Sequence, residues 1–254
     1  MLEVRGLSKR YNRIPAVDNV NFRIEAHRIL GYLGPNGSGK STTVKMITGL
    51  LEPSAGQILL DGVNIQDDLV AYKRRIGYVP EEPHLYPHLS GKEYLQLVGR
   101  LRGMRAKILD EKIDVFLTLF GLYEDRYVSL QSYSKGMRQK ILLCAALLHN
   151  PDVLIFDEPF SGLDVTAALV FRNLLKALAK EGKIILYSSH VLEVVEKVCD
   201  EVLILRKGTV VAHDSVERLR DLLSSPSLED IFAQLTQQTD TEQIAADMVA
   251  AMRL

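Results

Sequence analysis

The sequence is poor in cysteine, has no long apolar run and carries almost no excess charge. Only two of the 254 residues are cysteine, Cys144 and Cys199, and their spacing matches no paired motif, so we expect buried free thiols. No apolar run approaches the roughly 20 residues that cross a bilayer, and the first residues lack the apolar core of a signal peptide. We therefore expect a partner to supply any membrane role. The formal net charge of −1 gives no general attraction for nucleic acid, and we expect no nucleic-acid partner.

The rest of the composition is typical of a globular chain, with 47% hydrophobic and 25% charged residues. Alternating or apolar segments predict strands at residues 2–4, 19–24, 57–60, 152–157 and 183–189. The last two, DVLIFD and KIILYSS, are apolar enough to be buried on both faces of a parallel sheet. Between them and the first strands, residues 90–148 have mainly helical spacing, beginning with a capping-box pattern at Ser90 and Glu93. The segment EVLILRKGTVVAH predicts a hairpin.

The segment GPNGSGKST fits the pattern G-x-x-x-x-G-K-[ST] and lies between a predicted strand and a predicted helix. In such a loop, glycines let successive N–H groups turn towards an anion, and the helix N-terminus adds its dipole. We expect Lys40 to reach the β- and γ-phosphates, Ser41 to offer a hydroxyl to Mg²⁺, and Thr42 to donate to the α-phosphate. The candidate nucleotide-binding residues of the loop are Gly34, Pro35, Asn36, Gly37, Ser38, Gly39, Lys40, Ser41 and Thr42.

Two carboxylates, Asp157 and Glu158, stand at the end of the predicted strand VLIFD. They are costly there unless they meet a cation or a reacting water, so Asp157 fits a Mg²⁺ ligand and Glu158 a general base. His190 ends another apolar strand, at the edge where open α/β sheets bind ligands. It is a candidate contact for the γ-phosphate or the attacking water. We interpret three other histidines as surface or capping residues: His27, His149 and His213.

Taken together and in order, these motifs resemble those of the ATP-binding-cassette (ABC) ATPases over about residues 2–213. YVPEE falls at the family's Q-loop, YSKGM at its LSGGQ-type signature, SGLD at its D-loop and SSH at its switch histidine. Tyr11 falls at the aromatic position that stacks on adenine in relatives. The resemblance implies an α/β fold: a P-loop NTPase of the ABC ATPase type, with a RecA-like core, an N-terminal antiparallel β subdomain and an α-helical insertion. It implies an ABC ATPase domain at 1–213, with the helical subdomain at about 85–148, and a mostly helical tail at 214–254.

The resemblance also implies a site shared by two cassettes that meet head to tail, as a homodimer or a pair of different cassettes. The signature helix of one cassette then caps the γ-phosphate held by the other, and Asp164 at the dimer face links the two sites. The signature residues are Ser134, Lys135, Gly136 and Met137. Ser134 and Gly136 would supply the hydroxyl and N–H donors. Lys135 and Met137 replace the family's glycine and glutamine, and Lys135 is expected either in solvent or as a positive charge near the partner's nucleotide.

A further departure is Glu81, where the family usually has glutamine. Its carboxylate could ligate Mg²⁺ or orient water, but it adds negative charge near the phosphates, which could slow hydrolysis or make it depend on a docked partner. These variants and the tail SLEDIFAQLT resemble the exporter ATPases of the drug, lipid and polysaccharide kind more than the importers. Three apolar residues after the Q-loop are expected either to line the groove for a permease or to pack inside the insertion: Leu85, Tyr86 and Leu89.

The resemblance thus implies a subunit that dimerises on ATP, hydrolyses it with Mg²⁺ and drives export through a separate membrane-spanning permease. Its expected location is cytoplasmic, peripheral on the inner face of the cell membrane through that partner. Two alternatives remain open at this stage. One is a soluble ABC ATPase without a transporter, serving DNA repair, chromosome structure or translation. The other is a nucleotide-gated regulatory module with little turnover, which Glu81 would favour.

Overall fold

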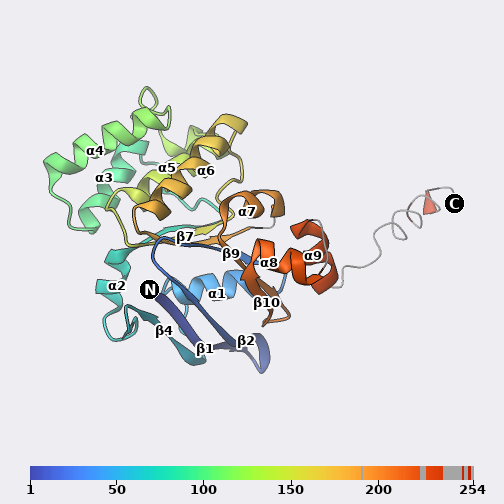
Figure 1. Cartoon of the computed structure of the whole chain (residues 1–254). Helices are drawn as coiled ribbons and strands as arrows, with labels where there is room; N and C mark the ends of the chain where they lie inside the picture. Colours follow the sequence, from blue (N-terminus) through green and yellow to red (C-terminus); the bar gives the residue numbers. More distant parts are fainter. Residues whose placement is uncertain (190, 224–226, 237–247, 249–250, 253–254) are drawn as a thin grey trace.

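The computed structural model describes residues 1–189, 191–223, 227–236, 248 and 251–252. The first of its two sheets is antiparallel, with strand order β2-β1-β4-β5 (Figure 1). Its strands are β1 (Leu2–Tyr11), β2 (Ile14–Ile24), β4 (Ala55–Leu60) and β5 (Val63–Asn64). β1 and β2 are longer than predicted because register shifts after Val4 and Leu7 disrupt the apolar alternation while the strands stay paired. Asn12 and Arg13 have positive φ angles of 46° and 76° and form the tight turn between them.

The second sheet has six strands in the order β10-β9-β3-β8-β7-β6, all parallel except β10. They are β3 (Ile29–Leu33), β6 (Ile76–Val79), β7 (Val153–Asp157), β8 (Ile184–Ser188), β9 (Glu201–Arg206) and β10 (Thr209–Ser215). Every residue of β3, β7 and β8 is buried, which confirms the prediction of two-sided burial from the apolar runs. β9 and β10 form the predicted hairpin, joined at Lys207 and Gly208. The carboxyl ends of β3, β7 and β8 lie at one edge of the sheet, where the chemical motifs follow them.

Helices cover both faces of this sheet (Figure 1). On one face α1 (Lys40–Ile47) packs Val44 and Met46 against Leu30 of β3, and on the other Ile29 of β3 meets the helices α5, α6 and α7. The remaining helices are α2 (Leu69–Arg75), α3 (Gly91–Leu101), α4 (Ala106–Leu119), α5 (Lys135–Leu147), α6 (Val165–Lys180), α7 (Leu192–Val198), α8 (Val216–Leu223) and α9 (Leu228–Thr236). None of the helices among the described residues is long and apolar enough to cross a membrane.

The insertion between β6 and β7 consists mainly of α3, α4 and α5, around a small core of its own. Ser90 and Glu93 form the predicted capping box at the start of α3, with the Ser90 N–H donating to the Glu93 carboxylate at 2.8 Å. α5 joins the insertion to the main domain, because it contributes Ile141 and Cys144 to the insertion core and Leu143 to the core against the sheet. Both cysteines are free thiols, and Cys144 is buried as predicted, whereas Cys199 is only half-buried.

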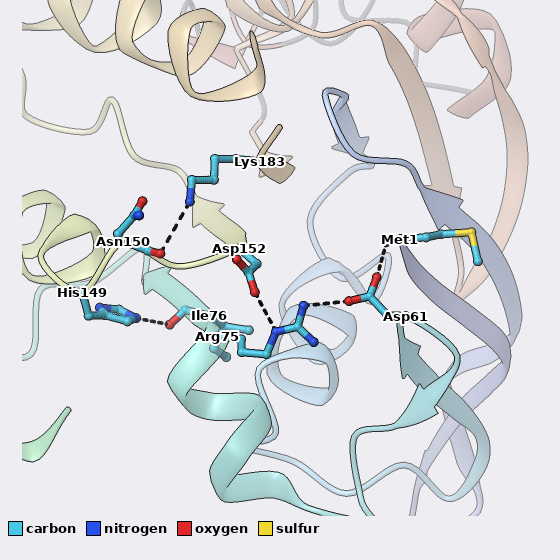
Figure 2. A network of polar contacts seen from close by, with 8 residues as sticks. All are labelled: Met1, Asp61, Arg75, Ile76, His149, Asn150, Asp152 and Lys183. Atoms are coloured by element: carbon cyan, nitrogen blue, oxygen red, sulfur yellow. Dashed lines mark hydrogen bonds and ion pairs between the residues drawn. The ribbon is translucent and has the colours of Figure 1, made fainter. Parts of the chain in front are cut away.

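A network of polar contacts ties the antiparallel sheet to the parallel one (Figure 2). Arg75, at the end of α2, donates to Asp152 at 2.6 Å and to Asp61 at 2.7 Å, and Asp61 also accepts from the Met1 amine at 2.7 Å. Asp152 directly precedes β7, and Asp61 lies between β4 and β5. These groups are partly exposed, so each ion pair contributes little alone, and the network chiefly fixes how the two sheets meet.

His149, at the other end of this network, is half-buried and not the surface or capping residue predicted (Figure 2). Its Nε2 lies 2.9 Å from the Ile76 carbonyl, and its buried Nδ1 makes no hydrogen bond within the described part of the chain. Burial lowers the pKa of His149 from 6.5 to about 4, and the Arg102 guanidinium acts in the same direction. The folded protein therefore holds this imidazole neutral in the pH range where the unfolded chain would protonate it.

We expect the His149 contribution to stability to be complete above pH 6.5 and to be lost as the pH falls from 6.5 towards 4. Because the ring is only half-buried, the loss is on the order of 1 kcal/mol in the free energy of unfolding. Urea unfolding of the native protein and of His149→Gln at pH 7.5 and pH 4.5 measures it. Glutamine keeps a donor for the Ile76 carbonyl but does not titrate, so its stability should fall less. Equal losses in both proteins would contradict this assignment.

Candidate nucleotide site

The loop of residues 34–42, which joins β3 to α1 and includes the first turn of that helix, lines a cavity of about 660 Å³. A Cβ on Gly34 would lie 2.5 Å from the Leu205 carbonyl, and one on Gly39, where φ is +106°, would lie 2.4 Å from the Ala16 carbonyl. Glycine is therefore required at both positions to bring the backbone of the loop against its neighbours. The first N–H groups of α1 have no partner within the helix and belong to this loop, so they are available to an anion.

Eight of the nine loop residues predicted to bind nucleotide line this cavity. The exception is Ser38, whose side chain is buried beneath the loop. Its backbone carbonyl accepts from the Gly208 N–H at 2.9 Å, which anchors the loop to the β9–β10 turn. Ser38 thus holds the loop in place from behind, and its hydroxyl does not line the cavity.

Three carboxylates, which we call the acidic cluster, also line the cavity: Glu81, Asp157 and Glu158. Asp157 ends β7 and is 5% exposed, and burial raises the pKa of its carboxyl, as do the neighbouring carboxylates. Glu158 has a positive φ of 49°; its N–H donates to the Ser188 carbonyl at 2.9 Å, and its Oε2 accepts from the Ser189 hydroxyl at 3.0 Å. The ends of β7 and β8 therefore hold Glu158 in a conformation that the residue rarely adopts alone.

Lys40 places one positive charge in the cavity beside this cluster. Its Nζ donates to the Gly34 carbonyl at 2.5 Å and to the Pro35 carbonyl at 3.2 Å, so the side chain folds back over the loop. Burial lowers the pKa of the Lys40 ammonium, and the acidic cluster acts in the opposite direction. An ammonium held over a glycine-rich loop at a helix N-terminus and beside carboxylates suits a polyphosphate carried with a divalent cation.

The cavity has the donors for Mg²⁺ but no complete metal site of its own. Among the residues that the structure describes, no three His, Cys, Asp or Glu side chains gather to hold a metal ion. Mg²⁺ usually keeps several waters and binds through one or two carboxylates and the substrate's phosphates. The hydroxyl of Ser41 and the carboxylate of Asp157, both at the cavity, fit that pattern, and Glu81 adds a third oxygen donor.

The structure does not bring Tyr11 to the cavity, although the resemblance placed it beside the adenine. Tyr11 ends β1, is 48% exposed and does not line the cavity, and the Lys9 ammonium lies 5.7 Å from the centre of its ring. The nearby strand β2 instead brings Ala16 to the cavity. His190 lies outside the described residues. Next to it, the Val191 N–H donates to the Ser189 hydroxyl at 3.1 Å, which gives Ser189 a contact to both Glu158 and this segment.

The signature residues 134–137 lie at the start of α5 and do not line the cavity of their own chain. Ser134 is the N-cap of α5, where its oxygen accepts from the Met137 N–H at 3.2 Å while its O–H stays able to donate. Met137 is half-buried and packs on the insertion core, which accounts for an apolar residue at that position. Asp164 is the N-cap of α6, accepts from the Ala167 N–H at 2.8 Å and also lies away from the cavity.

The signature is attached to the D-loop of the same chain. Lys135 is exposed, as the first of its two expected positions requires, and its ammonium donates to the Ser161 hydroxyl at 2.6 Å; its approach to a second nucleotide stays a prediction. A Cβ on Gly136 would lie 2.4 Å from the Gly162 carbonyl, so glycine is needed here for close packing within the chain. One turn further along α5, the fully buried Gln139 donates to the Pro159 carbonyl at 3.2 Å. The start of α5 and residues 159–164 therefore form one unit.

We expect Lys135→Met to lower ATP turnover about three- to tenfold while leaving ATP affinity unchanged, because it frees the D-loop without touching the cavity. Ser161→Ala should have the same effect, and the double variant should be no worse than either single one. Lys107→Met, on the exposed face of α4, is the matched control. Steady-state turnover and ATP binding measure both quantities. Effects of the two single variants that simply add would show that the hydrogen bond has no role.

Four cavity residues were not predicted from the sequence: Ala16, Leu192, Glu229 and Phe232. Leu192 comes two residues after His190 in the sequence, so the switch motif could have indicated that Leu192 lies near the site. Ala16 has no functional group and belongs to no motif, so nothing in the sequence indicates a binding role. Glu229 and Phe232 come from α9, within the tail segment SLEDIFAQLT and far along the chain from the P-loop, and only the packing of the tail brings them to the cavity.

Comparisons with known proteins agree with this geometry. Residues 17–161 match the family model described as ABC transporter. The chain is 37% identical over 237 residues to the ABC transporter ATP-binding protein NatA of Bacillus subtilis, covering 91% of this chain and 96% of NatA. Its fold matches a structure titled "Structure of ATP binding subunit of ABC transporter" with a TM-score of 0.87 and 33% identity, covering 92% of this chain and 99% of that one. It also matches the dimeric post-hydrolysis cassette MJ0796 bound to ADP and Pi, with a TM-score of 0.79 and 25% identity, covering 85% and 98%.

Proposed function

The chain belongs to the family of ABC transporter ATP-binding proteins, and we propose that it drives export as a homodimer beneath a separate membrane-spanning permease. As a member of that family it binds ATP and is an ATPase. The observation that carries the proposal is that the chain has both halves of an ABC site but does not bring them together. The P-loop and the acidic cluster share one cavity, whereas the signature and Asp164 lie away from it. A second copy placed head to tail supplies the missing half.

In the proposed reaction, the loop N–H groups and Lys40 hold the phosphates of ATP. Mg²⁺, when bound with the nucleotide, would neutralise phosphate charge and be held by Ser41 and Asp157. Glu158 orients the attacking water and accepts its proton, since its carboxylate is fixed at the cavity by Ser189. The partner's Ser134 hydroxyl and the N-terminus of its α5 cover the γ-phosphate from the other side. Hydrolysis then removes the group that joins the two copies, and they separate.

Export is proposed on narrower grounds than the ATPase activity. The support is the resemblance of the Q-loop segment and of the tail to exporter ATPases. Docking to a permease follows from the same resemblance, which gives the insertion as the docking region. Of the three apolar residues expected there, Leu85 and Leu89 pack on the insertion core, and Tyr86 is 63% exposed, with its ring centre 6.3 Å from that of Tyr94. Tyr86 is therefore the residue that we propose to contact the permease.

We expect Tyr86→Arg to lower recovery of the protein with membranes at least fivefold, while ATP binding stays unchanged. Val70→Arg, a similarly exposed apolar position on α2 at 64% exposure, is the matched control and should not alter recovery. Membrane fractions from cells that express each variant at equal levels provide the measurement. Equal recovery of native protein and Tyr86→Arg would refute this docking surface. Recovery of the native protein with nucleic acid or ribosomes instead would favour a soluble ABC ATPase.

A further inference from the structure

The last described helix, α9, forms part of the wall of the nucleotide cavity. Glu229 and Phe232, one turn apart on α9, line it together with the P-loop and the acidic cluster. Glu229 is exposed as well as lining the cavity, so it lies at the boundary between the cavity and solvent. Both residues belong to the tail segment SLEDIFAQLT, but its resemblance to exporter ATPases gives neither of them a role at the nucleotide, and no step of the reaction above uses them.

α9 is held firmly in this position. Leu228 and Ile231 are fully buried, and Phe232 is 9% exposed, in the same core cluster as Val195 of α7. Burial of apolar side chains of this size stabilises the contact between α9 and the core. The N-terminus of α9 is also capped, because the Ser227 hydroxyl accepts from the Asp230 N–H at 3.1 Å and donates to its carboxylate at 2.6 Å. The position of Glu229 at the cavity therefore follows from a packed helix and not from a loose tail.

The preceding helix anchors the same unit from another direction. Val216 and Leu219 of α8 are buried in the core cluster that contains α7, and Arg220 of α8 forms an ion pair with Glu196 of α7. α7 begins at Leu192, which itself lines the cavity. α7, α8 and α9 thus form a continuous packed layer that ends in Glu229 and Phe232 at the site.

The charge of Glu229 acts against the ligand that the cavity is built for. Among the residues of the cavity lining that the structure describes, Lys40 is the one lysine or arginine, and there are four carboxylates, namely the acidic cluster and Glu229. In the proposed reaction Asp157 binds Mg²⁺ and Glu158 accepts a proton from water, and Glu81 occupies the Q-loop position. Glu229 takes part in no step of that reaction, and its negative charge repels the phosphates. This repulsion grows with the charge of the nucleotide and falls when Mg²⁺ neutralises part of it.

Resting on the proposed function, we infer that α9 is part of the nucleotide site and that Glu229 is a specificity-determining residue, which disfavours metal-free ATP more than Mg²⁺-loaded ATP. The effect is electrostatic and acts through solvent, so it is modest and sensitive to salt. Neutralising Glu229 should tighten metal-free ATP about two- to fivefold at low ionic strength, and Mg²⁺-ATP by less.

Equilibrium binding of ATP to the full chain, with Mg²⁺ or with EDTA, tests this in the native protein, Glu229→Gln and Glu217→Gln. Glu217 is an exposed glutamate on α8 that does not line the cavity, so its variant removes the same charge from the same part of the molecule. The inference requires tighter binding by Glu229→Gln alone, most strongly without Mg²⁺, with the difference lost at about 1 M salt. Unchanged or weaker binding by Glu229→Gln, or equal tightening by Glu217→Gln, overturns it. A native protein that does not bind ATP at all would refute the proposed function instead.

Discussion

Replacement of Glu158 by glutamine is expected to lower the ATP turnover number about 10²- to 10³-fold, while ATP affinity stays within about twofold of native. Glutamine has the size of glutamate and an oxygen that can still accept from the Ser189 hydroxyl, so the positive φ at this position and the shape of the cavity are kept. It cannot accept the proton of the attacking water. The variant should therefore accumulate with ATP bound, and because ATP joins the two copies, as a dimer.

Turnover, nucleotide binding and mass in solution, measured on one preparation, test this expectation. Glu82→Gln is the matched control, because Glu82 is the next residue after Glu81 but its side chain is 80% exposed and does not line the cavity. We expect native turnover from that control. Turnover within a few-fold of native in Glu158→Gln would mean that another group accepts the proton, and the role given to Glu158 would be wrong.

Replacement of Lys40 by methionine is expected to weaken ATP binding at least 100-fold. The change removes the ammonium but keeps most of the length of the side chain, so the described part of the cavity lining is left with the acidic cluster and no lysine or arginine to offset it. Removing one partner of a partly buried charge pair costs about 2–5 kcal/mol, and 100-fold in affinity is about 2.7 kcal/mol. Methionine also frees the Gly34 and Pro35 carbonyls, to which the ammonium now donates.

Direct binding of a fluorescent ATP analogue to native protein and to Lys40→Met gives the ratio of dissociation constants. Lys45→Met, on the exposed side of the same helix, is the matched control and should bind as the native protein does. A thermal melt of each protein checks that the fold is kept. Affinity reduced less than tenfold in Lys40→Met would show that the loop backbone alone holds the nucleotide.

The parts of the site that could be predicted from sequence are those whose chemistry is local. The P-loop needs glycine at fixed positions because its own backbone must turn inwards and approach Ala16 and Leu205, so the pattern of residues carries the geometry. The position of Asp157 at a strand end could be predicted because it is the first charged residue after an apolar run, and a buried strand ends where charged side chains follow. The parallel sheet followed from the same apolar runs.

The features that could not be predicted depend on packing between distant segments. Lys135 reaches Ser161, which lies 26 positions further along, and no pattern near Lys135 indicates that contact. Glu229 reaches the cavity only because Leu228 and Ile231 pack α9 on the core beside α7. His149 looked like a surface residue, yet it lies against β6, 73 positions away. In each case the residue type allows several environments, and the tertiary fold selects one.

A complementation experiment tests the central claim, that the active site is completed by a second copy. Lys40→Met has a defective P-loop and an intact signature, and Gly136→Asp has the reverse, because the new side chain also strikes the Gly162 carbonyl. Each variant alone should be inactive, and mixing them should restore turnover, since one of the two sites in the mixed dimer has an intact P-loop facing an intact signature. Mixing the double variant with native protein should add no activity, because both sites of that mixed dimer are incomplete. We predict that only the mixture of single variants gains ATP turnover; no gain there would contradict a shared site.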